Sequence, residues 1–341
     1  MLFQSISRKN SLSQSRRHLP ERAMTALSNN NGRAYEYVFL VTLANSIRQY
    51  RGADVLEDSC YNASKEAWGK VKKAAQDDLR LGAEAAIQTL FDLEPMMVEP
   101  TDDKMILKIQ SDQNGKKGDV RDIVVARRDV RWEIGLSLKH NHFAVKHSRL
   151  SPTIDFGEKW YGVPCSQSYW KAVNPIFDYL SCEEKKKSKW SSLTNKNNAV
   201  YIPLLNAFVQ EIEAAKKHNP AIPRRLIEYL LGVFDFYKVI SVDAKRVTQI
   251  QAFNFHGKLN QPSKTKQPVK TISIPHFPTE IVSLRVKPGS STTVEMYLNN
   301  GWQLSFRIHN ASTNVETSLK FDIQIVGLPL AYIYTVTCKW Q

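Results

Sequence analysis

The chain has 341 residues, of which 42% are hydrophobic and 23% are charged. This composition is typical of a globular protein with a buried core, and it excludes a membrane-spanning chain because no stretch approaches eighteen consecutive apolar residues. The four cysteines form neither close pairs nor a metal-binding spacing, so a reducing, cytoplasmic location is expected. The formal net charge of +14 favours a polyanionic partner such as DNA or RNA; the alternative is a solvated basic surface without a partner.

The first segment of the chain is rich in serine and arginine. Residues 1–23 hold five basic side chains and one acidic side chain, and taking these away leaves +10 of the original +14, so the basic excess belongs to the body of the protein. We expect residues 1–28 to be a basic, disordered and dispensable tail. The alternatives are a transit peptide and a translation start at Met24.

The predicted elements begin with a helix in "NNNGRAYEYVFLVTLANSIRQY", after an Asn/Gly capping signal. Helical patterns follow over residues 63–80 and 82–94. Short strands are then predicted in "KMILKIQSD", "DIVVARR" and "RWEIGLSLK". Residues 151–195 are interpreted as loop-rich, with aromatic side chains that we expect to pack in the core.

Two later segments contain an early proline and are predicted to be helices, "IPLLNAFVQEIEAAKKHNP" and "PRRLIEYLLGVFDFYKVI". Residues 257–270 form a polar, basic linker. Beyond it the pattern is almost all strand, with "YLNNGWQLSFRI" as a hairpin that turns at Asn-Gly. The sequence therefore predicts an α/β (α+β) fold, with a main domain over residues 29–250 that carries helical insertions. Residues 251–341 form a β-rich C-terminal portion, either a DNA-recognition unit or packed on the core.

One predicted strand has an unusual pattern. Because side chains alternate between the two faces of a strand, "EIGLSLK" places Ile134, Leu136 and Leu138 on one face. The other face carries an acid, a glycine without a side chain, a hydroxyl and an amine, namely Glu133, Gly135, Ser137 and Lys139.

The preceding segment "DIVVARR" is separated from this strand by a short turn around residues 128–130, so the two should pair as an antiparallel hairpin. Asp122 would then lie opposite either Gly135 or Ser137. Directly opposed residues share a face and lie about 5 Å apart. Asp122 is therefore expected on the polar face, beside Lys139, with Gly135 leaving room next to it.

An aspartate that faces another acid and a lysine suits phosphodiester hydrolysis. Carboxylates bind Mg²⁺, which prefers oxygen ligands, and the metal polarises the phosphate and lowers the pKa of the attacking water. A lysine orients that water or stabilises charge in the transition state. The candidate catalytic residues are Asp122, Lys139, Glu133 and Ser137.

These segments resemble a known family. "RDIVVARRDVRWEIGLSLK" is similar to the P-D…(D/E)-x-K nuclease core, with Asp122 in the first motif and Ser137-Leu138-Lys139 in the second. More specifically, the chain from about Gly32 onward resembles the HaeIII-type type II restriction endonucleases in "GRAYEY", "KIQSD", "GDVRDI", "RWEIGLSLKHNHFAVKHSRLS", "DFGEKWYG" and "FRIHNAST".

The resemblance implies a restriction-endonuclease-like core, a mixed sheet flanked by helices. It also implies a Mg²⁺-dependent enzyme that cuts double-stranded DNA at a short palindrome, GGCC for the namesake of the family. A cognate DNA methyltransferase that protects host DNA is the implied functional partner. Cutting both strands of a palindrome further suits a two-fold homodimer.

The chain departs from the general motif at position 137, where serine stands in place of an acid. Glu133 lies about 13 Å further back along the strand and does not simply replace it. A second candidate is Glu36, because a carboxylate on a core-facing helical stripe needs a partner; that stripe holds Leu40, Leu43 and Ile47. The predicted metal ligands are Asp122 first, Glu36 second and Glu133 third.

The acids also have structural interpretations. Glu36 could simply favour the positive N-terminus of its helix. Asp122 could be a turn residue at a strand end. Glu133 could be an ion-pair partner of Arg131 or Arg121.

The other polar residues likewise have alternatives. Lys139 could extend to the surface or touch a phosphate, and Ser137 could hydrogen-bond to a neighbour. Asp119 is an alternate acid to Asp122.

The stretch "HNHFAVKHSRL" follows the polar strand. His140, Asn141 and His142 spell H-N-H, but that nuclease motif is spread along a ββα fold and is not a consecutive triplet. A zinc site from His140, His142 and His147 is an open alternative. We expect this stretch instead to contact DNA phosphates, which position a duplex without reading its sequence; the candidates are His142, Lys146, His147 and Arg149.

Base recognition requires donors and acceptors in the major groove. Candidates lie in residues 151–195 and in the C-terminal strands, where they include Arg307, His309 and Asn310. The function favoured by the sequence is a sequence-specific endonuclease, and the alternative is a non-catalytic DNA-binding protein on a degenerate nuclease fold. RNA binding is less favoured because no single-strand stacking motif is evident.

Overall fold

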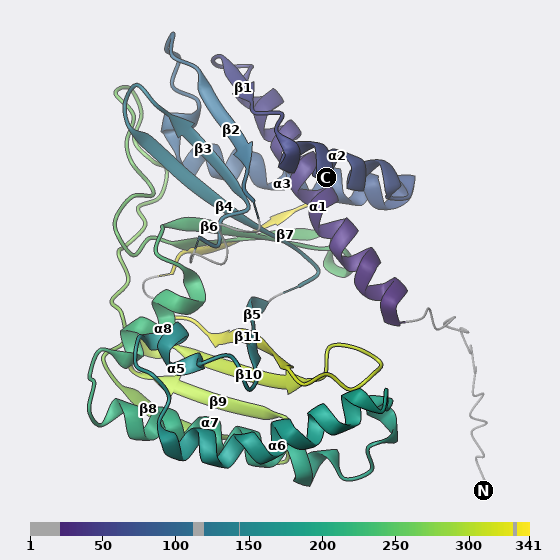
Figure 1. Ribbon diagram of the computed structural model, residues 1–341. Coiled ribbons are helices and arrows are strands. Elements are labelled where there is room, and N and C mark those ends of the chain that lie inside the picture. The colour runs from purple at the N-terminus through teal and green to yellow at the C-terminus, as the bar shows by residue number, and fades with distance from the viewer. Residues whose placement is uncertain (1–20, 112–118, 143, 330–332) are drawn as a thin grey trace, which may run out of the picture.

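The computed structural model describes residues 21–111, 119–142, 144–329 and 333–341. Within these ranges the strands form two sheets (Figure 1). Sheet A runs in the order β1 (Ala53–Val55), β2 (Met105–Ile109), β3 (Ile123–Arg127), β4 (Trp132–His140), β6 (Phe236–Val242), β7 (Val247–Phe253) and β12 (Thr335–Lys339). Sheet B runs in the order β5 (Ala144–Leu150), β11 (Leu319–Gly327), β10 (Gln303–His309), β9 (Thr293–Leu298) and β8 (Ile281–Val286).

Sheet A is mixed, because β1 and β2, and also β4 and β6, pair in parallel while its other neighbours are antiparallel. One of its faces is covered by helices α1 (Glu21–Ile47), α2 (Ser59–Lys70) and α3 (Lys73–Leu93) (Figure 1). The apolar side of β4 packs there: Leu136 and Leu138 join Phe39, Leu43 and Val239 in one core. The alternate residues of β4 therefore point to the opposite face.

Sheet B is covered by helices α5 (Phe156–Tyr161), α6 (Gln167–Lys185), α7 (Ile202–Lys216) and α8 (Ile222–Leu231) (Figure 1). A second core lies between them, where the rings of Trp160, Phe208, Phe306 and Phe321 touch one another. The expectation that the aromatic residues of 151–195 pack in the core is confirmed for Trp160. The expectation of a loop-rich segment is wrong over α5 and α6.

The predicted helix that began at Pro223 is half helix and half strand. Helix α8 ends at Leu231, and Gly232 follows with a φ of 85°, in the region that favours glycine. Residues 236–242 then form β6, between β4 and β7. Burial on both faces makes this strand mostly apolar, with Lys238 and Ser241 as its polar residues, and so weakens the alternation that distinguishes a strand from a helix.

The other local predictions hold in outline. The hairpin at Asn-Gly is confirmed, with β9 and β10 joined through Asn299–Gly301. The break between α2 and α3 falls at residues 71–72 rather than at 81. Helix α1 begins at Glu21, ahead of the expected domain start at residue 29. Among the described helices, none combines the length and apolar character that a membrane span requires.

The two sheets do not divide the chain at one position. Strand β5 lies in sheet B although it follows β4 directly, and β12 returns from the C-terminal portion to the edge of sheet A. The predicted domain boundary near residue 250 therefore does not coincide with the division into two sheets, and it stays a prediction.

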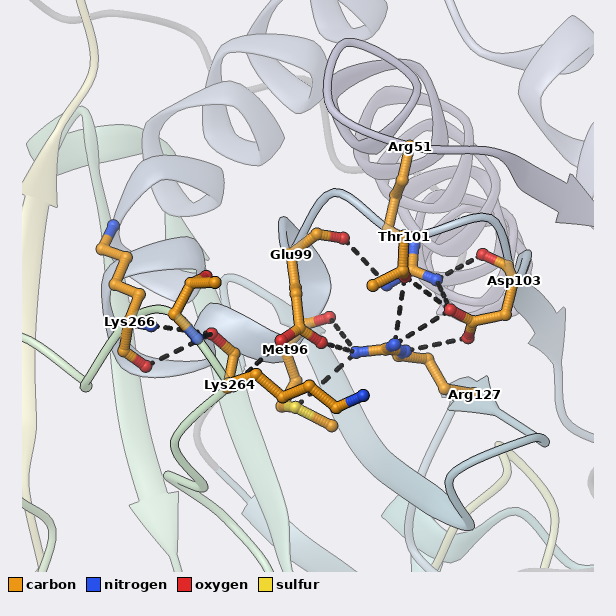
Figure 2. Close-up of polar contacts among 10 residues, drawn as sticks. Arg51, Met96, Glu99, Thr101, Asp103, Arg127, Lys264 and Lys266 are labelled. Atoms are coloured by element: carbon orange, nitrogen blue, oxygen red, sulfur yellow. Dashed lines mark hydrogen bonds and ion pairs between the residues drawn. The ribbon is translucent and has the colours of Figure 1, made fainter.

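A buried charge cluster fixes the far end of β3 (Figure 2). The Arg127 guanidinium is 2.5 Å from Glu99 Oε2 and 2.9 Å from Asp103 Oδ1. Arg51 also binds Asp103, and the pKa of that carboxyl is held well below its usual range by Arg127. Glu99 Oε1 accepts the backbone N–H of Lys264 at 2.7 Å. The cluster thereby attaches the 257–270 segment to the strand that leads back to Asp122.

Candidate active site on the polar face of sheet A

The β3–β4 hairpin sets the register of the candidate site. Ile123 pairs with Leu136 and Val124 pairs with Gly135, on either side of the turn predicted around residues 128–130. The backbone N–H of Asp122 donates to the Leu136 carbonyl at 2.8 Å, which continues the ladder by one residue. Of the two expected partners, Asp122 therefore lies opposite Ser137.

Three donors converge on a single oxygen of Asp122. Its Oδ2 accepts the backbone N–H of Leu138 at 2.6 Å, the Ser137 hydroxyl at 3.3 Å and the Lys139 ammonium at 3.2 Å. The Asp122 and Lys139 side chains are 25% and 27% exposed, so a substrate can reach the pair. The structure thus brings together Asp122, Ser137 and Lys139, as the sequence predicted.

A second lysine borders this cluster and was missed from the sequence. Strand β6 pairs in parallel with β4, and Lys238 lies opposite Ser137. Lys238 is only 4% exposed, and burial, together with the charge of Lys139, lowers its pKa to about 7. Its segment was predicted to be a helix, and a helix would not have placed Lys238 beside Ser137. The glycine at 232, followed by a compact apolar run, was the signal for a strand.

Gly135 makes room for an arginine. A Cβ at this position would lie 1.9 Å from Cδ of Arg121, so only glycine allows that side chain to cross the strand. The Arg121 guanidinium is 2.8 Å from Asp119, 2.6 Å from Glu133 and 4.0 Å from the centre of the Phe234 ring. Glu133 is therefore an ion-pair partner of Arg121, the structural alternative considered above, and Asp119 is bound to the same arginine.

Glu36 lies on α1 and is half-buried, with its Oε2 3.5 Å from the Ser64 hydroxyl on α2. The stripe predicted beside it is in the core, since its three residues are fully buried: Leu40, Leu43 and Ile47. Over the described part of the chain, no three His, Cys, Asp or Glu side chains gather closely enough to hold a metal ion. Among the described residues, neither Glu36 nor Glu133 thus completes a three-ligand site with Asp122. The zinc alternative includes His147, whose side chain lies outside the described part, so it stays untested.

The residues present nevertheless fit a sparsely ligated Mg²⁺. All hydrogen bonds that described residues make to the Asp122 carboxylate end on Oδ2, which leaves Oδ1 for a cation. Mg²⁺ keeps several waters and is often held by only one or two carboxylates together with substrate phosphates. Asp122 would hold the ion, and Ser137 is the neighbouring oxygen donor.

Two of the side chains on β5 that were predicted to contact phosphates already bind groups within the protein. The Lys146 ammonium donates to the Tyr229 carbonyl at 2.7 Å and lies 3.7 Å from the centre of the Tyr229 ring, and burial lowers its pKa to about 8. Arg149 pairs with Glu316 at 3.1 Å. The backbone of His147 pairs with Asp322, while its side chain lies outside the described part.

The remaining DNA-contact candidates differ in exposure. His142 and Arg307 are exposed. His309 is half-buried, 3.7 Å from Asp322, and burial lowers its pKa below the usual histidine value. Asn310 is buried and donates to the carbonyls of its own loop. Arg307 therefore remains the most accessible base-reading candidate of sheet B, and Asn310 is a loop-forming residue.

An Asp–Lys pair at the start of β3 and on β4, on a mixed sheet with helices packed behind it, fits the restriction-endonuclease-like nuclease core that the sequence predicts. The chain belongs to the HaeIII restriction endonuclease family, whose model matches residues 32–329. It is 46% identical over 319 residues to the type II restriction enzyme HaeIII of Haemophilus aegyptius, and the match covers 93% of this chain and 100% of that protein. No solved structure gives a significant match.

The family membership confirms three expectations from the sequence: the resemblance itself, the restriction-endonuclease-like α+β fold, and a site-specific deoxyribonuclease whose substrate is DNA. It favours the enzyme over the non-catalytic alternative, because the relative is named as an enzyme and the match covers its whole length.

Proposed function

We propose that this protein is a Mg²⁺-dependent type II restriction endonuclease that hydrolyses both strands of duplex DNA at GGCC. The observation that carries the proposal is the convergence of Ser137, Leu138 N–H and Lys139 on one oxygen of Asp122, in a chain that is 46% identical to a type II restriction enzyme. The GGCC site is implied by the family's namesake.

In this proposal Asp122 holds the divalent cation through the oxygen that its neighbours leave open. The bound ion supplies Lewis-acid polarisation of the phosphate and a lowered pKa for coordinated water. Lys139 stabilises the negative charge that develops on the phosphate, and its pairing with Asp122 holds its ammonium at the site. Ser137 orients Asp122, and Glu133 keeps Arg121 in place beside it.

The duplex would be positioned by basic side chains around this face. Phe236 and Phe253 lie on the same face of sheet A as Lys238 and belong to the core beside sheet B. The polar face of sheet A therefore borders sheet B and its helices. We propose that exposed His142 and Arg307 contact the DNA, with His309 beside them. Lys146, His147 and Arg149 are proposed as supporting contacts on β5.

The proposed setting is that of a restriction–modification system. A cognate methyltransferase would protect host DNA, the enzyme would work in the cytoplasm, and a two-fold homodimer would match the symmetry of the palindrome. The net charge of +14 supports duplex binding through phosphate neutralisation.

The test is digestion of unmethylated phage DNA by the purified full chain, with Mg²⁺ or with EDTA, followed by sequencing of the fragment ends. The expected result is discrete fragments that end within GGCC, form only with Mg²⁺, and are absent when the site is methylated beforehand. Fragments that end at another sequence would refute the GGCC assignment. DNA that stays intact but is retarded on a gel would refute the cleavage itself.

A further inference from the structure

Two exposed apolar side chains lie next to each other in the link between α8 and β6. Val233 is 53% exposed and Phe234 is 44% exposed. Single apolar side chains on a protein surface are ordinary, but in the described part of the chain no other two large exposed hydrophobic residues are neighbours in sequence. An aromatic ring in water gives up the free energy that burial would provide, so its place on the surface favours a role in binding.

The link that carries Phe234 is held at both ends. It begins at Gly232, whose φ of 85° ends helix α8. Asp235, which follows Phe234, is buried, and its carboxylate accepts the backbone N–H groups of His256 and Lys258 at 2.9 and 2.8 Å. The backbone on either side of the ring is therefore anchored, and the ring is exposed from a fixed position.

The Phe234 ring also packs on the arginine beside the active site. The Arg121 guanidinium lies 4.0 Å from the centre of the ring. This guanidinium is itself held by Asp119 at 2.8 Å and by Glu133 at 2.6 Å. The contact between cation and ring fixes the orientation of the ring, while much of the remaining ring surface stays open to solvent.

This part of the surface lies close to the proposed site of cleavage. Arg121 directly precedes Asp122, and its side chain crosses β4 at Gly135 on the polar face of sheet A. Gly135 is two residues from Ser137, or about 7 Å along the strand. Each DNA strand carries a phosphate about every 3.4 Å along the helix axis, so Phe234 would lie within a few base steps of a phosphate at Asp122.

The chemistry around the ring suits bases better than phosphates or another protein. The carboxylates of Asp119 and Glu133 outnumber the Arg121 guanidinium, so this group has an excess of negative charge and does not attract a phosphate. Aromatic side chains, by contrast, stack on bases, and apolar ones insert between base steps. Val233 and Phe234 also offer far less apolar area than the roughly 800 Å² per partner of a stable protein–protein interface.

We propose that Phe234 is a base-stacking residue of this enzyme, which inserts at a base step near the scissile phosphate and partly unstacks it. The inference rests on the proposed function above. Arg121 is the positioning residue of the ring, and Gly135 provides the space that Arg121 needs. Stacking on Phe234 offsets the cost of opening the step, and this cost depends on the DNA sequence. The residue would therefore contribute to selectivity as well as to affinity.

The experiment compares Phe234→Ala with Phe234→Trp, which keeps an aromatic face. Tyr179→Ala is the matched control, because Tyr179 is an aromatic residue of similar exposure, 40%, but lies on α6 beside sheet B. The probes are GGCC duplexes that carry either the fluorescent analogue pyrrolocytosine at a cytosine of the site or 2-aminopurine in an adjacent A·T pair. Both analogues become brighter when they are unstacked.

The readouts are the fluorescence of these duplexes without Mg²⁺, the salt dependence of binding, thermal melting and sedimentation of the free protein. Single-turnover cleavage at GGCC is measured in parallel with Mg²⁺. The native enzyme should brighten at least one probe on binding. For Phe234→Ala we expect the brightening to be lost and binding to weaken by about tenfold, with melting close to native.

The salt-dependence slope of Phe234→Ala should stay unchanged, because no phosphate contact is removed. Phe234→Trp should retain the brightening, and Tyr179→Ala should resemble the native enzyme. A purely structural role of the ring would lower melting and leave the brightening in place.

The proposal is overturned if Phe234→Ala brightens the probes as the native enzyme does, or if this variant does not fold. It is also overturned if the same change converts a dimer of the free protein into monomers, which would make the ring a contact between two copies. Native enzyme that cuts no GGCC duplex would count against the proposed function. Normal native cutting without brightening of any probe would count against Phe234 alone.

Discussion

The Asp122 carboxylate lies 3.2 Å from the Lys139 ammonium, on adjacent strands whose register places both on the polar face of sheet A. An ion pair at the same distance, 3.2 Å, joins Asp54 and Lys104 elsewhere on the sheet, but there both side chains are more than half exposed. The two pairs are alike in chemistry and differ in their surroundings. This makes the second pair a natural control for the first.

Replacing Asp122 by asparagine should abolish cleavage while preserving the fold. The amide oxygen can still accept the Leu138 N–H, but it carries no charge to bind a divalent cation. We expect the single-turnover rate to fall by more than about 100-fold, with melting within a few degrees of native. Asp54→Asn is the control and should leave the rate unchanged; an Asp122→Asn enzyme that keeps a tenth of the native rate would exclude the assigned role.

Replacing Gly135 by alanine should displace Arg121. The new Cβ would meet the arginine side chain at 1.9 Å, so either the strand or the Asp119–Arg121–Glu133 arrangement must shift. We expect a loss of about 2 kcal/mol in the free energy of unfolding together with slower cleavage. The control is Gly69→Ala, at an exposed position of α2 where nothing lies within 4 Å; equal effects of the two changes would contradict this account.

The charge cluster of Figure 2 should matter for stability rather than for chemistry. The Arg127 and Glu99 side chains are both only 3% exposed, so Glu99→Ala leaves a buried guanidinium with one acid fewer. Such a loss costs about 3–5 kcal/mol, measurable by urea unfolding. Glu66→Ala, which removes an exposed helical ion pair with Lys70, should leave the unfolding curve unchanged. A small effect of the Glu99 change would show that the cluster does not hold β3.

Glu94 should make stability depend on pH. Burial raises the pKa of Glu94 to about 7, against the hydrogen bonds from Asn260 and Tyr237, and its other oxygen has no partner among the described residues. Because the folded pKa lies above the unfolded value of 4.5, the contribution to stability is full below pH 4.5 and is lost as the pH rises through 7.

The measurement is the free energy of unfolding of native protein and of Glu94→Gln between pH 4 and about 8. We expect the native protein to lose stability relative to the variant as the pH rises. A constant difference between the two over this range would mean that folding does not raise the pKa of Glu94.

Much of the candidate site could be predicted from local sequence because β3 and β4 are joined by a short turn. Alternation along β4 separated Leu136 and Leu138 from Ser137 and Lys139. Hairpin parity reduced the possible partners of Asp122 to Gly135 and Ser137, of which Ser137 is correct. The room at Gly135 was also anticipated. That Arg121 fills this space was not anticipated. Arg121 precedes the strand and reaches the face through a bend at residue 122, which the alternation of side chains along a strand does not describe.

Lys238 could not be found in this way. Its relation to Ser137 comes from a parallel pairing between strands far apart in the chain, and no local period encodes such a pairing. The strand itself is buried on both faces, is mostly apolar and follows a true helix, so the helical pattern of α8 was extended too far. For the same reason, the joining of β12 to sheet A and of β5 to sheet B was not visible in the sequence.

The most direct test of the central claim is the single-turnover cleavage of a GGCC duplex by Lys139→Met beside Lys104→Met, each with Mg²⁺ and with EDTA. If the polar face of sheet A is the active site, Lys139→Met binds the duplex but cuts it at least about 100-fold more slowly, while Lys104→Met cuts at the native rate and EDTA stops every enzyme. Native cleavage by Lys139→Met would show that the chemistry takes place elsewhere on the molecule.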